Sequence, residues 1–179
     1  SSAPFEENIR ETKEVVHAAH IVGVSVEAEL GCVGFGRLSD DENTDSFTKP
    51  EDVDIFIRET GADCLAIAIG TAHGHYKGTP KIDFERLDAI RAVTSVPLVL
   101  HGGSSTGEEN LKKAVRHGIS KVNIGTDLSD AAKGNIIDFL SDHDPHQRGV
   151  YGKMLTAGMQ GYGDKLEEYM ILFGSAGQW

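Results

Sequence analysis

Two histidines, each followed by glycine, are the residues of this chain most suited to chemistry. His73 lies in GTAHGHYKG (70–78) and His101 begins HGGSS (101–105), and each segment follows a short apolar run. Neighbouring strands lie about 4.8 Å apart, so imidazoles at matching heights on adjacent strands can share one ion at Zn–N distances of about 2.0–2.1 Å. A single histidine at a strand end is more often a structural residue. Two of them together favour a metal site.

Two carboxylates stand close to each other in the segment VEAEL (26–30). Glu27 and Glu29 share one face of the expected strand, because side chains alternate with a period of two. Paired carboxylates on a parallel strand are unfavourable unless they meet a metal, a base or a sugar hydroxyl. Glu29 is nearer the carboxyl end of the strand, and we expect it to be the functional one.

Glycine-rich turns after the strands offer backbone N–H groups to an anion. Ser104, with the amides of Gly102 and Gly103, forms a candidate anion nest before a helix expected to begin near residue 107. The run NIGTD (123–127) adds the Asn123 amide and the Thr126 hydroxyl on the same rim. Taken alone, that run is more typical of a helix N-cap.

The elements that must position these residues alternate along the chain. Short β-branched runs separated by helical patterns indicate βαβ units and a parallel sheet, in which ligands bind at the carboxyl ends of the strands. The strands are expected over 23–29, 64–70, 96–101 and 121–125. The helices are expected over 4–21, 49–60, 83–94, 107–118, 128–142, 151–158 and 165–173.

Composition limits the class of protein. The 179 residues carry 17 basic and 28 acidic side chains, a net charge of −11, which disfavours nucleic-acid and anionic-membrane partners. The two cysteines, Cys32 and Cys64, are too few and too far apart for a disulfide scaffold. No window approaches the about 20 apolar residues that span a bilayer, and no signal-peptide pattern opens the sequence. We therefore expect a cytoplasmic protein with reduced thiols.

Six sequence blocks carry a family resemblance and cover nearly the whole chain in one order. The blocks are PFEENI (4–9), GVSVEAELG (23–31), IGTAHGHYKGTPKIDFERL (69–87), PLVLHGGSS (97–105), KVNIGTDL (121–128) and LFGSAG (172–177). With them, the chain resembles the class II fructose-bisphosphate and tagatose-bisphosphate aldolases. The resemblance implies an α/β fold of the TIM (β/α)8 barrel family. This chain would cover about the last four strand–helix units and the C-terminal helices, as one domain over 1–179 that lacks the N-terminal strands.

The resemblance also implies a site. Zinc would be held by histidines that include His73 and His101, with Glu29 able to join them in some states, and Glu29 and Asn123 would be catalytic. A phosphosugar substrate would be bound by Gly74, Lys77, Gly102, Gly103, Ser104, Asn123 and Thr126. Zinc would polarise the ketone as a Lewis acid, so that no Schiff-base lysine is needed. The resemblance leaves open a monovalent cation near the phosphate, in addition to zinc. We expect a homo-oligomer.

Departures from the family pattern accompany these matches. The family's catalytic Asp and first zinc His have no counterpart in this chain. Arg37 stands roughly where one subclass has a proton-transferring glutamate; Asp40, Asp41 and Glu42 are candidates to replace it, or form a solvated acidic loop. Ser105 occupies a usual glycine position and Arg148 is a candidate for the second phosphate.

Three hypotheses for function remain open at this stage. The first is a metal-dependent aldolase that forms dihydroxyacetone phosphate and glyceraldehyde 3-phosphate from a ketose 1,6-bisphosphate, with the isolated chain weakly active or inactive. The second is a non-catalytic phosphosugar-binding or accessory subunit. The third is another barrel lyase or isomerase whose activity survives a chelator. The choice between fructose and tagatose bisphosphate stays open.

Overall fold

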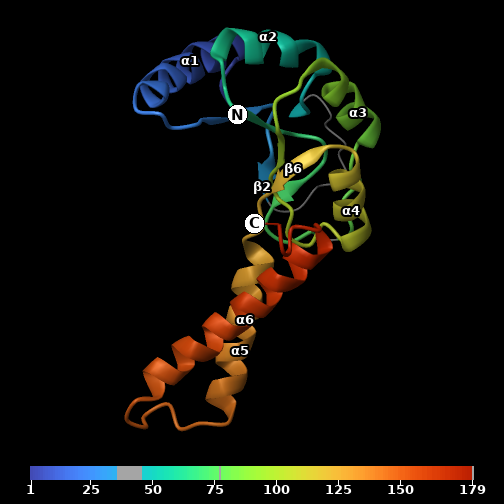
Figure 1. Ribbon diagram of the computed structural model, residues 1–179. Helices are drawn as coiled ribbons and strands as arrows, with labels where there is room; N and C mark the ends of the chain where they lie inside the picture. The colour runs from blue at the N-terminus through green and yellow to red at the C-terminus, as the bar shows by residue number, and fades with distance from the viewer. Residues whose placement is uncertain (36–45, 77, 179) are drawn as a thin grey trace. The chain divides into compact units, whose positions relative to one another are not determined.

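The computed structural model describes residues 1–35, 46–76 and 78–178 (Figure 1). The chain divides into two compact units, Ser1–Asn123 and Ile124–Trp179. The first unit is an α/β unit and holds the strands. The second unit consists of two long helices and is described separately below.

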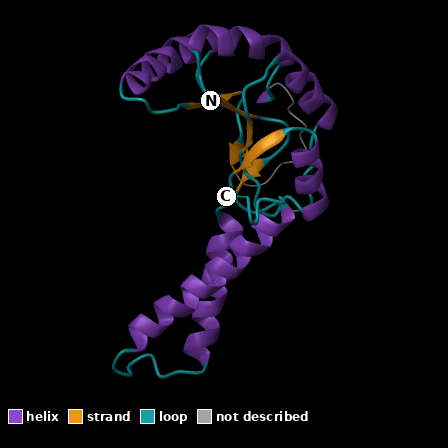
Figure 2. Cartoon of the chain, in the orientation of Figure 1, coloured by secondary structure: helices purple, strands orange, loops and turns teal. Residues whose placement is uncertain are grey.

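A four-stranded parallel sheet lies at the centre of the first unit (Figure 2). Its strand order is β1 (Glu27–Leu30), β3 (Cys64–Ile67), β5 (Leu98–Leu100) and β6 (Ile119–Val122). The side chains of β5 are wholly buried, as are those of Leu65 to Ile67 in β3. Strands covered on both faces require such continuous apolar runs, which is why the sequence predicted these two strands most clearly.

Four helices connect and cover these strands. They are α1 (Phe5–Ile21), α2 (Pro50–Thr60), α3 (Phe84–Val93) and α4 (Glu108–Arg116), and Figure 1 shows them following one another along one side of the sheet. Local signals set their ends: Pro50 begins α2, where its missing N–H is harmless, and Asp83 caps α3 by accepting a hydrogen bond from the Arg86 amide at 2.9 Å. Phe56, Leu87 and Leu111 bury their apolar faces in the core.

The second predicted strand, 64–70, is shorter than expected and is followed by a separate one. β3 ends at Ile67 because the backbone N–H and C=O groups of the next residue, Ala68, are hydrogen-bonded to Thr48. The Thr48 amide donates to the Ala68 carbonyl at 2.9 Å, and the Ala68 amide donates to the Thr48 hydroxyl at 2.8 Å. The chain then forms β4 (Ala72–His73), which pairs in parallel with β2 (Gly34–Phe35). This two-stranded sheet carries His73 and was not predicted.

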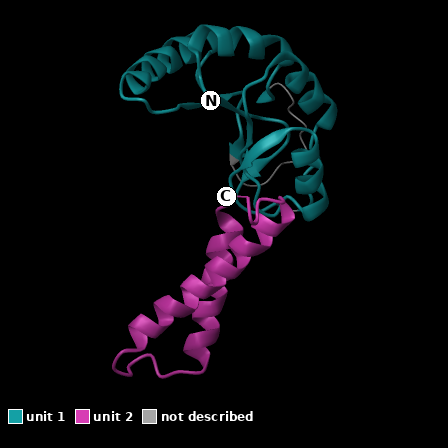
Figure 3. Ribbon diagram, viewed as in Figure 1, with its two compact units in different colours: residues 1–123 teal, residues 124–179 magenta. Residues whose placement is uncertain are grey.

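The second unit contains α5 (Thr126–Ser141) and α6 (Val150–Leu172), drawn in magenta in Figure 3. The prediction of two helices over 151–158 and 165–173 was wrong, because α6 runs unbroken through its glycines. A Cβ on Gly158 would lie 2.8 Å from Ile136, and one on Gly161 would lie 2.5 Å from the Ala131 carbonyl oxygen. Close packing on α5 thus outweighs the about 1 kcal/mol by which each glycine disfavours a helix.

Among the described residues, no helix is both long enough and apolar enough to span a membrane. The long helix α6 mixes charged and polar residues with its apolar ones.

Candidate active site

The structure brings His73 and His101 together. His73 is the last residue of β4, and His101 follows directly after β5. The centroids of their imidazole rings are 5.8 Å apart, with the ring planes at 56°. His73, in the two-stranded β2–β4 sheet, thus lies close to His101 at the carboxyl end of β5 in the four-stranded sheet, the end at which parallel α/β folds bind ligands.

The turn that follows His101 packs directly against the backbone beside His73, and this contact brings the two histidines together. Gly102 has a φ of 67°, and a Cβ at that position would lie 2.3 Å from the Ala72 carbonyl oxygen, so no larger residue fits. The Tyr76 hydroxyl accepts from the Ala72 amide at 2.7 Å and lies 2.8 Å from the carbonyl oxygens of both Ala72 and Gly102. Burial raises the pKa of Tyr76, although hydrogen bonds to Ala72 and Thr106 oppose the increase. The phenol therefore stays protonated and able to donate.

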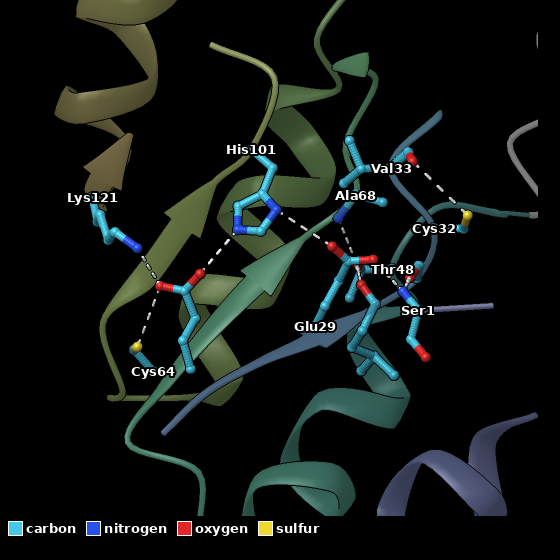
Figure 4. Close-up of polar contacts among 12 residues, drawn as sticks. Ser1, Glu29, Cys32, Val33, Thr48, Cys64, Ala68, His101 and Lys121 are labelled. Carbon is cyan, nitrogen blue, oxygen red and sulfur yellow. Dashed lines mark hydrogen bonds and ion pairs between the residues drawn. The ribbon is translucent and has the colours of Figure 1, made fainter. Parts of the chain in front are cut away.

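Both carboxylates of β1 contact His101, from opposite sides of its ring (Figure 4). Oε1 of Glu27 lies 2.9 Å from Nε2, and Oε2 of Glu29 lies 3.4 Å from Nδ1. The other oxygen of Glu27 accepts a hydrogen bond from Lys121 at 2.7 Å. Glu29 also pairs with the amino group of Ser1, which donates to the Gly31 carbonyl as well.

The ionisation of Glu27 follows from these contacts. Partial burial of the carboxyl raises its pKa, but the hydrogen bonds from Lys121 and His101 have the larger combined effect, and the pKa lies below its ordinary value. Cys64 lies opposite Glu27 in the ladder, with its sulfur 3.8 Å from Oε2. Burial, and then the charge of Glu27, raise the pKa of that thiol. Cys64 is thus a poor nucleophile at neutral pH.

The candidate anion nest has a more specific geometry than the sequence indicated. Ser104 is buried, at 4% exposure, in the turn after His101. The Gly103 amide donates to the Asn123 carbonyl at 3.1 Å, so this N–H ties two strand ends together rather than facing an open nest. The backbone amide of Asn123 in turn donates to the Leu100 carbonyl at 2.9 Å. Ser105 adopts a left-handed φ of 57°.

The remaining predicted residues fall in different places. Gly74 follows His73 directly, with a φ of 92°. Thr126 is the first residue of α5 in the second unit, and Gly125 is the N-cap. Arg148 is exposed between α5 and α6. The predictions for Arg37, Asp40, Asp41, Glu42 and Lys77 concern residues outside the described part of the chain.

The donor set fits part of a zinc site. Imidazole nitrogens and a carboxylate oxygen are ligands that zinc accepts, and two imidazoles on one tetrahedral zinc have centroids roughly 5 Å apart at the usual Zn–N distance of about 2.0–2.1 Å. The observed separation of 5.8 Å is close to that. Within residues 1–35, 46–76 and 78–178, no three His, Cys, Asp or Glu side chains converge as a complete metal cluster.

Three contributors to this site were missed or undervalued from the sequence. Tyr76 and Lys121 lie inside the family blocks but carried no predicted role. Glu27 was recognised as sharing a face with Glu29, and only Glu29 was selected. The alternating pattern of β1 was the available signal for Glu27, because both glutamates are half-buried while Ala28 and Leu30 are buried.

Comparison with known proteins identifies the family. The model of the class II fructose-bisphosphate aldolases matches residues 1–178. The chain belongs to this family. Among solved structures, the YdjI aldolase from Escherichia coli K12 is 35% identical with a TM-score of 0.81, and 99% of this chain aligns with 60% of it.

Two other solved aldolase structures resemble this chain. A putative fructose-1,6-biphosphate aldolase from Coccidioides immitis is 27% identical with a TM-score of 0.81, over 98% of this chain and 61% of that one. The fructose-bisphosphate aldolase from Campylobacter jejuni is 25% identical with a TM-score of 0.77, over 97% and 58%. This chain spans about 60% of the length of these relatives. Its α/β architecture, with parallel strands and outer helices, therefore matches part of a class II aldolase barrel.

Proposed function

We propose that this chain takes part in metal-dependent aldol cleavage and condensation of a ketose 1,6-bisphosphate, with dihydroxyacetone phosphate and glyceraldehyde 3-phosphate as the three-carbon partners. The single observation that carries the proposal is the approach of His73, at the end of β4, and His101, just after β5, with ring centroids 5.8 Å apart. Membership of the class II aldolase family supports it.

The metal would be zinc, held by His73 and His101 with Glu29 beside them. A bound zinc ion would supply a Lewis acid that polarises the substrate carbonyl. Glu29 lies 3.4 Å from Nδ1 of His101, on the opposite side of the ring from Glu27. Its carboxylate can therefore join the ligands or hold a proton near the reacting carbon.

Phosphate recognition would fall to the turns that follow these histidines. Gly74 and Gly102 bring backbone close to a ligand, and Ser104 and Asn123 provide polar groups at the ends of neighbouring strands. The roles of Gly103, Lys77 and Thr126 in binding the phosphosugar, and that of a monovalent cation near the phosphate, remain predictions. So do the single-domain interpretation of 1–179, the homo-oligomer and the cytoplasmic location.

Metal titration tests the proposal directly. We expect the wild-type chain to bind one equivalent of Co²⁺ or Zn²⁺, and both H73A and H101A to bind at least about tenfold more weakly, since each removes a ligand. H143A is the matched control, because His143 stacks on Phe139 in the second unit. Equal affinity in H73A, H101A and H143A would contradict the shared site.

An activity measurement tests the reaction itself. The metal-loaded chain is expected to cleave fructose 1,6-bisphosphate or tagatose 1,6-bisphosphate weakly at most, and any such cleavage should be abolished by a chelator and by H101A. Activity that survives the chelator would instead indicate a metal-independent lyase or isomerase.

A second candidate function is non-catalytic phosphosugar binding. The described residues contain two imidazoles and a carboxylate without a complete cluster of three convergent metal ligands, and this observation favours it. Calorimetric titration with dihydroxyacetone phosphate separates the candidates. Binding without turnover in the presence of zinc supports the second, and turnover supports the first.

A further inference from the structure

Glu27 connects two side chains that lie far apart in the sequence. Its Oε1 meets Nε2 of His101 at 2.9 Å, and its Oε2 meets Nζ of Lys121 at 2.7 Å. The carboxylate comes from β1, the histidine follows β5 and the lysine belongs to β6. Glu27 and His101 are mostly enclosed, with side chains 26% and 18% exposed. This arrangement fixes both oxygens of one carboxylate on separate donors.

The contact with Glu27 determines which nitrogen of His101 carries a proton. An ionised carboxylate only accepts hydrogen bonds, so Nε2 must be the donor. A neutral imidazole has one N–H, and Nδ1 is then left with its lone pair. Nδ1 is the nitrogen that lies beside Glu29, at 3.4 Å.

We propose that Glu27 is the positioning residue of the site: it holds His101 as the Nε2–H tautomer, so that Nδ1 is the nitrogen offered to a divalent cation. The inference rests on the proposed function for the identity of the ligand, but the tautomer itself is a property of the metal-free chain. Carboxylates that bind the second ring nitrogen of a ligand histidine fix its orientation in this way. Neighbouring glutamates on one face of β1 thus have different roles.

Lys121 completes the arrangement. Its ammonium group requires an acceptor and occupies Oε2 of Glu27, which leaves Oε1 for His101. It also compensates the charge of Glu27, whose carboxylate contacts Nε2 of His101 and not Nδ1. The sequence separation of 94 residues between Glu27 and Lys121 means that only the folded sheet creates the pair.

The E27Q variant makes a sharp prediction because an amide has one acceptor and one donor end. Lys121 attracts the amide oxygen, which leaves the NH2 group facing Nε2 of His101. Nε2 must then become an acceptor, and the proton moves to Nδ1. In the double variant E27Q/K121M only the weak donor of the Cys64 thiol remains beside that end of the amide. The amide can then turn its oxygen toward Nε2, and the original tautomer should return.

The first measurement is ¹⁵N NMR of histidine-labelled, metal-free chain at about pH 9, well above the ordinary imidazole pKa of about 6.5. We expect a protonated Nε2 on His101 in wild type, a protonated Nδ1 in E27Q, and recovery in E27Q/K121M. D63N is the matched control, since Asp63 makes the same contact with His20 at 2.9 Å, and it should leave the His101 signals unchanged. A protonated Nδ1 in wild type, or no change in E27Q, overturns the proposal.

The second measurement is Co²⁺ affinity, followed by its absorption spectrum. E27Q should bind about 10- to 100-fold more weakly than wild type, D63N should bind as wild type, and E27Q/K121M should recover most of the loss. A purely structural role of Glu27 predicts no such recovery, because the double variant removes two native contacts. A wild-type chain with the Nε2–H tautomer that binds no metal would refute the proposed function and still support the role of Glu27 in fixing the tautomer.

Discussion

The hydroxyl of Tyr76 lies 2.8 Å from the carbonyl oxygen of Gly102, so one side chain joins the turn after His73 to the turn after His101. The same hydroxyl accepts from the amide of Ala72, which is 3% exposed. A hydroxyl has a single proton, which the carbonyls of Ala72 and Gly102 must share. The Tyr76 hydroxyl therefore holds together the turn that follows His73 and the turn that follows His101.

Removing that hydroxyl should destabilise the chain. Y76F leaves the buried Ala72 amide without its acceptor, and we expect a loss of about 1–3 kcal/mol in the free energy of unfolding. Urea unfolding measures the loss, and amide hydrogen exchange should show faster exchange at Ala72. Y162F is the control, because Tyr162 is 44% exposed on α6. Equal unfolding midpoints for the two variants would contradict the role assigned to Tyr76.

Ser105 stores backbone strain in the turn after His101. Its φ of 57° lies in the left-handed region, which disfavours residues with a Cβ by about 1–2 kcal/mol. We compare S105G with S105A, because both variants lose the hydroxyl and only one keeps the Cβ. S105G should be the more stable by about 1 kcal/mol in urea unfolding. Equal stability, or a more stable S105A, would show that the turn adopts another conformation.

Residue types and their periodicity predicted the main sheet and the chemistry at its edge. Continuous apolar runs located β3 and β5, and alternation placed Glu27 and Glu29 on one face of β1. The meeting of the two histidines was expected because parallel strands end at a common edge, although His73 lies on the separate strand β4 that follows β3. These inferences depend on patterns that are local in the sequence, and they needed no knowledge of tertiary contacts.

Features that depend on distant partners could not be predicted in this way. The Lys121 contact with Glu27 and the Tyr76 contact with Gly102 appear only when the sheet is assembled. The β2 and β4 ladder has two residues in each strand, too few for a periodic signal. The glycines of α6 suggested a helix break, and only the packing on α5 explains why they continue one helix.

The packing of α6 on α5 can be tested at its glycines. G161A places a Cβ 2.5 Å from the Ala131 carbonyl oxygen, and we expect a loss of about 1–3 kcal/mol from overpacking. G163A is the matched control in the same helix, because a Cβ there meets nothing within 4 Å. It should stabilise the helix by up to about 1 kcal/mol through propensity. Thermal unfolding followed by circular dichroism should therefore shift in opposite directions, and a common shift would contradict the close approach.

The exposed pair of Asp63 and His20 gives the stability of the first unit a pH dependence. The hydrogen bond from His20, and then the one from the Val26 amide at 2.7 Å, lower the pKa of Asp63 below its ordinary value of 3.8. An acid whose pKa is lower in the folded state stabilises that state above the unfolded pKa. The contribution is lost as the pH falls through the folded pKa.

D63N should therefore be less stable than wild type at pH 7, and the difference should shrink as the pH falls below 3.8. The variant keeps an acceptor for the Val26 amide, so the change reports mainly on charge. D54N is the control, because Asp54 pairs with Arg58 at 3.2 Å on the exposed surface of α2, and such pairs contribute little. The measurement is the urea unfolding midpoint of wild type, D63N and D54N between pH 7 and pH 3. A difference between wild type and D63N that stays constant with pH would show that ionisation of Asp63 is not its source.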